Sequence, residues 1–260
     1  MTEDLALIRK AALEAGKLAL TMRAAGLKIW NKDGGSPVTD ADLAVDKLLH
    51  ETLTTARPDY GWLSEETVDD PERLTRRRLF CVDPIDGTAA FLKDKPWFTV
   101  CIAVVEDGLP LCGVVYAPAL EELYEAVAGQ GATLNGAPIR PSATADLDDC
   151  AMLGDARMFQ HPEWPQPWPA MRVESRNSIA YRMCLVADGR FDAAVALSPK
   201  NEWDLAAADL IVREAGGAST DHFGRRFAYN APIPRAPSVI CAAPGLHRLI
   251  LERVAHIGRP

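Results

Sequence analysis

Two carboxylates, Asp83 and Asp86, stand three residues apart in the segment D-P-I-D-G-T, which directly follows an apolar run at residues 79–82. The proline restricts the backbone of this turn, and Gly87 lets the chain approach a ligand closely. Two hard oxygen donors placed in this way suit Mg²⁺, which binds a few carboxylates and completes its octahedron with waters and phosphate oxygens. Because Asp, Pro and Gly are also the common turn formers, a plain turn explains the same segment equally well.

Three further segments place carboxylates where each also has an ordinary explanation. Glu65 and Glu66 follow a short apolar stretch. Adjacent carboxylates repel each other, so this pair favours either solvent or a cation. Thr39 and Asp42 match a capping box at the start of a helix. Asp204 begins another helix, where capping alone explains an aspartate.

The order of these segments along the chain distinguishes them from unrelated turns and caps. V-T-D-A-D, S-E-E, D-P-I-D-G-T-A-A-F and W-D-L-A-A-A-(x5)-E-A-G-G follow one another in that order. In this the chain resembles the inositol monophosphatase superfamily over about residues 4–242. Its members are Mg²⁺-dependent, lithium-sensitive phosphomonoesterases that act on inositol phosphates, fructose bisphosphate and 3′-phosphoadenosine 5′-phosphate. The resemblance implies an α/β (α+β) fold, a sugar-phosphatase-like layered α/β/α/β/α sandwich with the site between its two halves.

Carried over residue by residue, the resemblance implies ligands for two or three Mg²⁺ ions: Glu65, Asp83, the carbonyl oxygen of Ile85, Asp86 and Asp204. Asp83 is expected to bridge two ions, with Asp86 and Asp204 holding the second. Thr88 is expected to act with Glu65 and Asp42 around the attacking water, and Gly87 and Thr88 are expected to contact the substrate. Asp40 lies beside Asp42, but the V-T-x-x-D spacing favours Asp42.

The chemistry of phosphoryl transfer is consistent with such a set of residues. A metal ion lowers the pKa of a bound water, and paired ions stabilise both the attacking and the leaving oxygen. The reaction needs mainly positioning and charge neutralisation, so carboxylates and metal ions suffice without a His or Cys nucleophile.

The substrate side departs from the animal inositol enzymes that the chain resembles. Those enzymes place an acidic residue that contacts inositol hydroxyls seven positions before the W-D aspartate, and here that position is Leu197. Lys200 is placed to meet a second phosphate, as in a bisphosphorylated nucleotide, although a solvated loop explains it as well. Ser175 and Ser178 precede a helix, so each either lines the pocket or caps that helix. The Trp- and Pro-rich segment 161–169 is either a lid or a packed loop.

The elements that must position these residues follow from hydrophobic periodicity. Helices are expected at residues 4–24, from Thr39 to before Pro58, at 178–187, at 203–215 and from Leu246 onward. Buried strands are expected at residues 61–64, 79–82, 150–153, 191–197 and 238–242. Runs at 98–105 and 111–116 flank Asp107 and Gly108, which predicts an antiparallel hairpin.

The pattern of expected helices and strands changes near residues 140–148. The first part is of the α+β kind with a hairpin, and the second part alternates helices and strands. We therefore expect an N-terminal half at residues 1–145 that carries most of the metal ligands. A C-terminal half at residues 146–260 contributes Asp204 and the substrate side.

Composition narrows the class of partner. Of 260 residues, 48% are hydrophobic and 25% are charged, and the net charge is −8. An acidic chain is unlike a binder of nucleic-acid polymers, and its longest apolar run, at residues 100–105, is far too short to span a membrane. A metal ion reverses the local sign of an acidic pocket, so a small phosphorylated metabolite remains the expected partner. Six cysteines without a C-x-x-C motif indicate reduced core residues in a cytoplasmic protein.

The leading hypothesis is thus a Mg²⁺-dependent phosphomonoesterase, similar to inositol monophosphatase, that hydrolyses a small phosphorylated polyol or sugar by metal-activated water. We expect it to be a homodimer. The alternative is a 3′(2′),5′-bisphosphate nucleotidase that acts on 3′-phosphoadenosine 5′-phosphate. A non-catalytic phosphometabolite-binding protein is the alternative from a different class.

Overall fold

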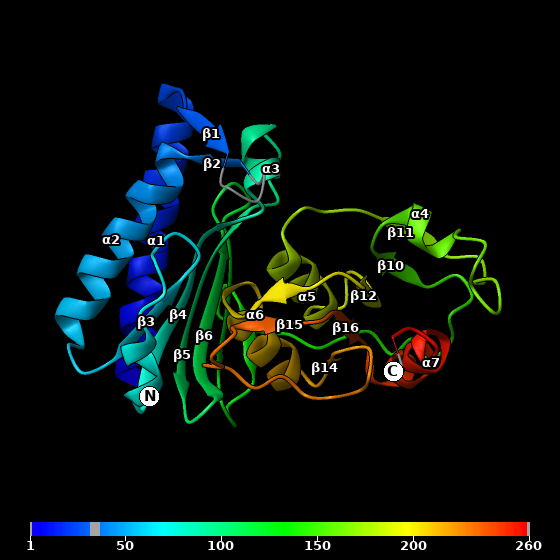
Figure 1. Cartoon of the computed structure of the whole chain (residues 1–260). Helices are drawn as coiled ribbons and strands as arrows, with labels where there is room; N and C mark the ends of the chain where they lie inside the picture. Colours follow the sequence, from blue (N-terminus) through cyan, green and yellow to red (C-terminus); the bar gives the residue numbers. More distant parts are fainter. Residues whose placement is uncertain (1, 32–36, 259–260) are drawn as a thin grey trace.

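The computed structural model describes residues 2–31 and 37–258, and its elements form five layers in the order α/β/α/β/α (Figure 1). Helices α1 (Thr2–Ala25) and α2 (Asp40–Ala56) form the first layer, and a seven-stranded sheet forms the second. Helices α5 (Ile179–Ala187) and α6 (Glu202–Ala215) separate this sheet from a five-stranded one, which α7 (Pro244–Val254) covers. The layered sandwich implied by the resemblance is confirmed.

The seven-stranded sheet places the carboxylate-bearing segments side by side. Its strands run in sequence order: β3 (Gly61–Ser64), β4 (Arg78–Asp86), β5 (Thr99–Glu106), β6 (Leu109–Ala117), β7 (Glu122–Val127), β8 (Ala132–Leu134) and β9 (Ala137–Pro138). The first two strands are parallel, joined through the 3₁₀ helix η1 (Pro71–Thr75), and the remaining pairs are antiparallel. Ser64 pairs with Val82, so the residues that follow them, Glu65 and Asp83, emerge at the same edge of the sheet.

Strand β5 is buried on both faces, which explains its continuous apolar run. Its even-numbered side chains at positions 100, 102 and 104 pack under α1 and α2. Its odd-numbered side chains at positions 101, 103 and 105 pack against α5 and α6. Because successive side chains of a strand point to opposite faces, one strand contributes to two hydrophobic layers.

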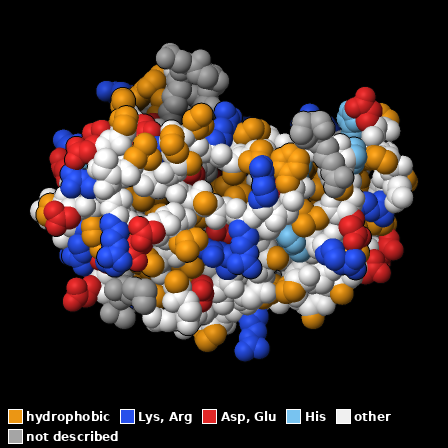
Figure 2. Space-filling model, turned by 60° about the horizontal axis from the view of Figure 1, so that its bottom comes forward, with side chains coloured by type: hydrophobic (Ala, Val, Ile, Leu, Met, Phe, Trp, Pro, Cys, Tyr) orange, Lys and Arg blue, Asp and Glu red, His pale blue; other side chains and the backbone are white. Residues whose placement is uncertain are grey.

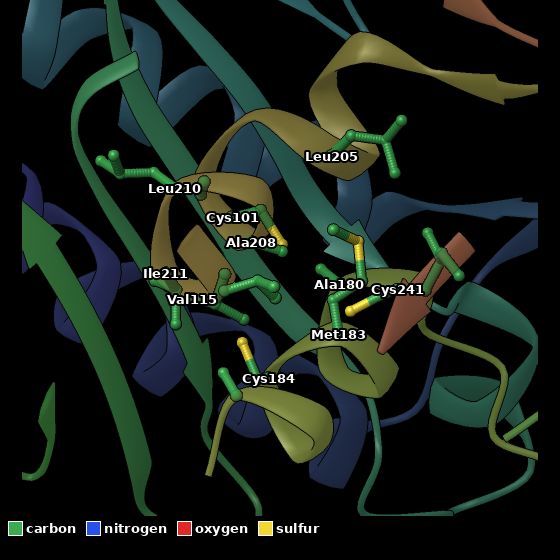
Figure 3. Packing of buried hydrophobic residues seen from close by; sticks show 14 of the residues in the cluster. Cys101, Val115, Ala180, Met183, Cys184, Leu205, Ala208, Leu210, Ile211 and Cys241 are labelled. Carbon is green, nitrogen blue, oxygen red and sulfur yellow. The ribbon is translucent and has the colours of Figure 1, made fainter. Parts of the chain in front are cut away.

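The central helical layer packs small side chains among larger aliphatic ones (Figure 3). Ala180, Cys184 and Ala208 lie in this layer between the two sheets. A Cβ atom on Gly113 of β6 would lie 2.9 Å from the Cα atom of Ala207. Glycine and alanine at this crossing therefore let α6 approach the sheet closely, which fixes the position of Asp204 at its first turn.

The five-stranded sheet has the order β11-β10-β12-β16-β14. Its strands are β10 (Ala151–Leu153), β11 (Arg172–Glu174), β12 (Ala193–Ala196), β14 (Ala218–Thr220) and β16 (Val239–Ala242). Two small two-stranded sheets pair β1 (Ile29–Asn31) with β2 (Pro37–Thr39) and β13 (Lys200–Asn201) with β15 (Arg235–Ala236). Short helices α3 (Thr88–Leu92) and α4 (Ala156–Phe159) complete the fold.

All five expected helices and the hairpin of β5 and β6 are confirmed. The strands from β7 to β9 were not predicted from the sequence. The division at residue 145 stays a prediction.

All six cysteines are buried and unbridged, as expected. Figure 2 shows a face on which acidic and basic side chains are interspersed without a continuous basic surface. None of the helices in residues 2–31 and 37–258 is long and apolar enough to cross a membrane.

Candidate active site

Three carboxylates converge at the edge of the seven-stranded sheet that faces α6. Glu65 follows β3, Asp83 lies in β4, and Asp204 lies in the first turn of α6. One carboxylate oxygen of each lies within 4.8 Å of the other two. Residues separated by more than 100 positions in the sequence thus form a group that could hold a cation.

Asp83 lies at the centre of this group and is 1% exposed. Its Oδ1 accepts a hydrogen bond of 3.0 Å from the backbone N–H of Ile85, while its Oδ2 is buried without a hydrogen-bond partner. Burial raises the pKa of Asp83 well above its ordinary value, and the charges of Glu65, Asp86 and Asp204 raise it further. A buried carboxylate oxygen without a partner is costly unless a cation or proton meets it.

Asp86 lies just beyond an irregularity in the pairing of β4 with β5. Its Oδ2 accepts hydrogen bonds from the Ser178 hydroxyl at 2.6 Å and from the Ala180 backbone N–H at 2.8 Å. Burial raises the pKa of Asp86 to about 6, although these two hydrogen bonds lower it. Asp86 falls outside the tight group of three but lines the same cleft.

The donor set fits a divalent cation such as Mg²⁺. Burial raises the pKa of Asp204 well above its ordinary value, as do the charges of Asp86 and Glu65. Clustered carboxylates that raise one another's pKa are stabilised as anions when a cation lies between them. Hard carboxylate and carbonyl oxygens are the ligands that Mg²⁺ prefers. The unpartnered Oδ2 of Asp83 is the observation that supports this fit most directly.

A hydrogen-bond network joins the turn after β4 to the start of α2. The Thr88 hydroxyl lies 3.2 Å from the carbonyl oxygen of Ile85 and 3.4 Å from Oδ1 of Asp42. Asp42 also accepts a 2.8 Å hydrogen bond from the Thr39 backbone N–H, and Thr39 caps α2 in return. The capping box is therefore real and presents Asp42 to the cleft residue Thr88. Asp40 instead accepts from the backbone N–H of Lys28, so it faces β1.

Gly87 is required by the backbone and by its neighbour. Its φ of +93° lies in the left-handed region, where side chains are disfavoured. A Cβ atom there would also lie 3.0 Å from the Ser178 backbone nitrogen. Gly87 therefore lets the start of α5 approach the turn closely, and this approach brings Ser178 to Asp86. Ser178 is the cap of α5, whereas Ser175 lies before it.

Glu65, Asp83, Asp86 and Asp204 line a cleft of about 770 Å³. The expected substrate-side residues Gly87, Thr88, Ser175, Leu197 and Lys200 all line it. Asn177, which belongs to the same expected segment as Ser175, lines it too. Three charged residues that the sequence reasoning missed line it as well: Asp155, Arg157 and Arg182. No local motif marks these three, because each acquires its place only from the packing of α4 and α5.

The Trp- and Pro-rich segment packs on the far side of the five-stranded sheet. Trp164 makes edge contacts with Trp168 and with His256, and its Nε1–H donates to the Met158 carbonyl at 2.6 Å. No residue of 161–169 is among those that line the cleft, in the part of the chain that the structure describes. The packed-loop alternative is therefore favoured over the lid.

Comparison with known proteins extends these observations. Residues 1–259 match the model of the inositol monophosphatase family. A histidinol-phosphatase of Chlorobaculum parvum is 36% identical over 234 residues, which cover 87% of this chain and 88% of that protein. A 3′(2′),5′-bisphosphate nucleotidase of Salmonella typhimurium is 34% identical over 203 residues, which cover 76% and 81% of the two chains. The solved IMPase of Thermotoga maritima superposes with a TM-score of 0.84 at 29% identity, covering 97% of each chain.

Proposed function

Because this chain belongs to the inositol monophosphatase family, it is a phosphoric monoester hydrolase, and we propose that it uses Mg²⁺ to hydrolyse the phosphate ester of a small polyol or sugar. The observation that carries the proposal is the group of Glu65, Asp83 and Asp204, whose carboxylate oxygens lie within 4.8 Å of one another. A cluster with an unpartnered buried oxygen is suited to a cation and not to the packing of a core.

In this proposal the side chains hold two or three ions through a defined set of oxygens: Glu65, Asp83, the carbonyl of Ile85, Asp86 and Asp204. The bound Mg²⁺ supplies positive charge to the phosphoryl oxygens and lowers the pKa of a water molecule. Ser178 and Ala180 fix the orientation of Asp86 through their hydrogen bonds to its Oδ2, so that Oδ1 is free to act as a ligand.

Thr88 and Asp42 orient the attacking water and receive its proton. The Thr88 hydroxyl lies within hydrogen-bonding reach of Asp42, so a proton taken up at Thr88 Oγ1 has a carboxylate beside it. Glu65 belongs to the carboxylate cluster and completes the set of groups around the water. Gly87 leaves room for the phosphate above the turn.

Three substrates are candidates within this reaction class. The polyol or sugar phosphate is the first proposal, although Leu197 in the cleft supplies no acceptor for a sugar hydroxyl. The similarity to a histidinol-phosphatase favours histidinol phosphate as a second candidate. The similarity to a bisphosphate nucleotidase favours 3′-phosphoadenosine 5′-phosphate as a third. A homodimer and a cytoplasmic location remain predictions.

The test is hydrolysis of p-nitrophenyl phosphate by metal-free protein, before and after addition of Mg²⁺. We expect activity only with Mg²⁺, its loss in Asp204→Asn, and its retention in Asp59→Asn, which alters an exposed aspartate. Phosphate binding without turnover would identify a non-catalytic binding protein instead. A panel of inositol 1-phosphate, fructose 1,6-bisphosphate, histidinol phosphate and 3′-phosphoadenosine 5′-phosphate then ranks the substrates.

A further inference from the structure

Three cationic side chains line the cleft beside the carboxylates: Arg157, Arg182 and Lys200. Arg157 is 89% exposed and lies against Asp155. Its Nη2 donates a hydrogen bond of 2.9 Å and its Nε one of 3.2 Å to the Asp155 carboxylate. Its charge is therefore already neutralised by a neighbour. The other two cations differ from Arg157 in this respect.

Arg182 and Lys200 are half-buried, and neither forms an ion pair with a carboxylate among the described residues. The Nε of Arg182 donates to the Arg176 carbonyl at 2.5 Å. The Nζ of Lys200 donates to the Ser198 hydroxyl at 2.7 Å and to backbone carbonyls. Both cations are thus held in place by neutral acceptors, and the carboxylates that act most strongly on their charge are the proposed metal ligands, Asp204 on Lys200 and Asp86 on Arg182.

The two cations share one region of the cleft and act on each other. Burial lowers the pKa of Lys200, the charge of Asp204 raises it, and the charge of Arg182 lowers it. Burial likewise lowers the pKa of Arg182, against the effect of Asp86. When Asp204 and Asp86 hold metal ions, these carboxylates no longer balance the two cations. An anion that bridges Arg182 and Lys200 would then stabilise them through charge-assisted hydrogen bonds.

Both cations line the cleft next to the carboxylate group. Arg182 lies one helical turn, about 6 Å, along α5 from Ser178, which binds Asp86. Lys200 lies four residues before Asp204, on β13. Resting on the proposed function, we infer that Arg182 and Lys200 form a second anion subsite that binds a phosphate or carboxylate of the substrate other than the phosphate being hydrolysed.

The same charges disfavour a cationic leaving group. Outside the carboxylates around Asp83 and Asp86, the described carboxylate that lines the cleft is Asp155, and Arg157 occupies it. The ammonium group of histidinol phosphate would therefore meet two cations and no free carboxylate. The subsite selects for bisphosphorylated or carboxylated phosphomonoesters.

The test compares substrates that differ only in the second phosphate. One pair is adenosine 3′-phosphate and adenosine 3′,5′-bisphosphate, and the other is fructose 1-phosphate and fructose 1,6-bisphosphate. We expect wild type to favour the bisphosphate of at least one pair by tenfold or more in kcat/KM, and the pair that responds identifies the nucleotide or sugar source. Arg182→Gln and Lys200→Gln should each reduce this ratio about tenfold. Arg248→Gln, which removes an exposed cation from α7, should leave the ratio as it is.

Two outcomes would overturn the subsite. A wild-type ratio near one in both pairs would show that no second anion is bound. Equal losses on both members of a pair in Arg182→Gln would assign Arg182 to the reacting phosphate instead. Absence of hydrolysis of every phosphomonoester, including p-nitrophenyl phosphate, would instead contradict the proposed function.

A binding measurement tests the subsite without turnover. In the presence of a chelator the metal-free carboxylates repel phosphate. The phosphate of adenosine 5′-phosphate can therefore bind only at Arg182 and Lys200. We expect adenosine 5′-phosphate to bind wild type at least tenfold more tightly than adenosine by calorimetry, and Lys200→Gln and Arg182→Gln to lose this difference. Equal binding of the two ligands to wild type would contradict the subsite.

Discussion

Replacing Asp86 by Asn should make the metal-free protein more stable while weakening its response to Mg²⁺. Asp86 is 7% exposed, and burial raises its pKa from 3.8 to about 6. At pH 8 the carboxylate is ionised in both the folded and the unfolded chain. Its negative charge is therefore less favourable in the folded protein than in water. Asparagine removes this charge and keeps an amide oxygen that can accept from both Ser178 and Ala180.

The magnitude follows from the pKa difference of about two units. One unit corresponds to about 1.4 kcal/mol, so the ionised Asp86 costs the folded state up to about 3 kcal/mol. Because the folded pKa is the higher one, the folded protein binds more protons between about pH 4 and pH 6. Its free energy of unfolding therefore falls as the pH rises from about 4 to about 6. Above that range the contribution of Asp86 no longer changes with pH. Asp86→Asn should abolish this part of the slope.

The assay is urea denaturation of wild type and Asp86→Asn at pH 5 and pH 8, in a chelator and in Mg²⁺. In the chelator at pH 8 the variant should be about 1–3 kcal/mol more stable, and at pH 5 the difference should shrink. A ligand present at one hundred times its Kd stabilises a protein by about 2.7 kcal/mol. Wild type should gain such an increment with Mg²⁺, and Asp86→Asn should gain less and lose turnover.

The matched control is Asp192→Asn, which lies away from the cleft. Asp192 accepts hydrogen bonds from Ser142, Thr144 and the Ala151 backbone, and although burial opposes them they lower its pKa. This variant should destabilise the protein at pH 8, because a lowered pKa means that ionised Asp192 stabilises the fold. A metal-free Asp86→Asn protein that is less stable than wild type at pH 8 would refute the reasoning, as would wild-type turnover at ordinary Mg²⁺.

Four further expectations are open to direct measurement. Gly87→Ala should lose about 1–3 kcal/mol of stability in urea, together with activity, because its φ is +93° and its Cβ would approach Ser178; unchanged stability would contradict this. Leu197→Glu should raise kcat/KM for inositol 1-phosphate relative to bisphosphates about tenfold, by supplying an acceptor for a hydroxyl. Trp164→Ala should lower the free energy of unfolding by about 2 kcal/mol, because ring contacts and a hydrogen bond are lost. A fall in kcat/KM of more than twofold would instead support a role of segment 161–169 as a lid. Millimolar-scale Li⁺ should inhibit hydrolysis where equal NaCl does not, as expected for the lithium-sensitive members that the chain resembles.

Elements with strong local patterns were predictable from the sequence. Helix α2 begins at Asp40 because Thr39 and Asp42, three positions apart in the sequence, form a capping box. The hairpin of β5 and β6 follows from two apolar runs around Asp107 and Gly108. The strands β7 to β9 were not predicted. β7 pairs with β6, β8 with β7 and β9 with β8, so hydrogen bonds to a neighbouring strand define these elements more than their own sequences do.

The metal-binding motifs were predictable in a different way. Each carboxylate alone had an ordinary explanation, and the structure shows that some of those explanations also hold. Asp42 completes the capping box of α2, and Asp204 accepts from the Asn201 backbone N–H at 2.9 Å. Only the order of the segments, through the family resemblance, assigned them to one site. The sequence could not show that these carboxylates lie close together. Glu65 and Asp83 are brought together by a parallel strand pair, and Asp204 comes from the central helical layer.

The sequence by itself determined the order of helices and most strands, the family and the set of candidate ligands, because these depend on periodicity, caps and motifs within a few residues. Only the tertiary structure decided which side chains share the cleft. Arg182 sits in a helix whose sequence pattern is that of an ordinary buried segment, and Ser178 has the pattern of an ordinary cap. Each takes part in the site because α5 packs against the turn at Gly87. Long-range packing sets such distances, and no local pattern of residues carries them.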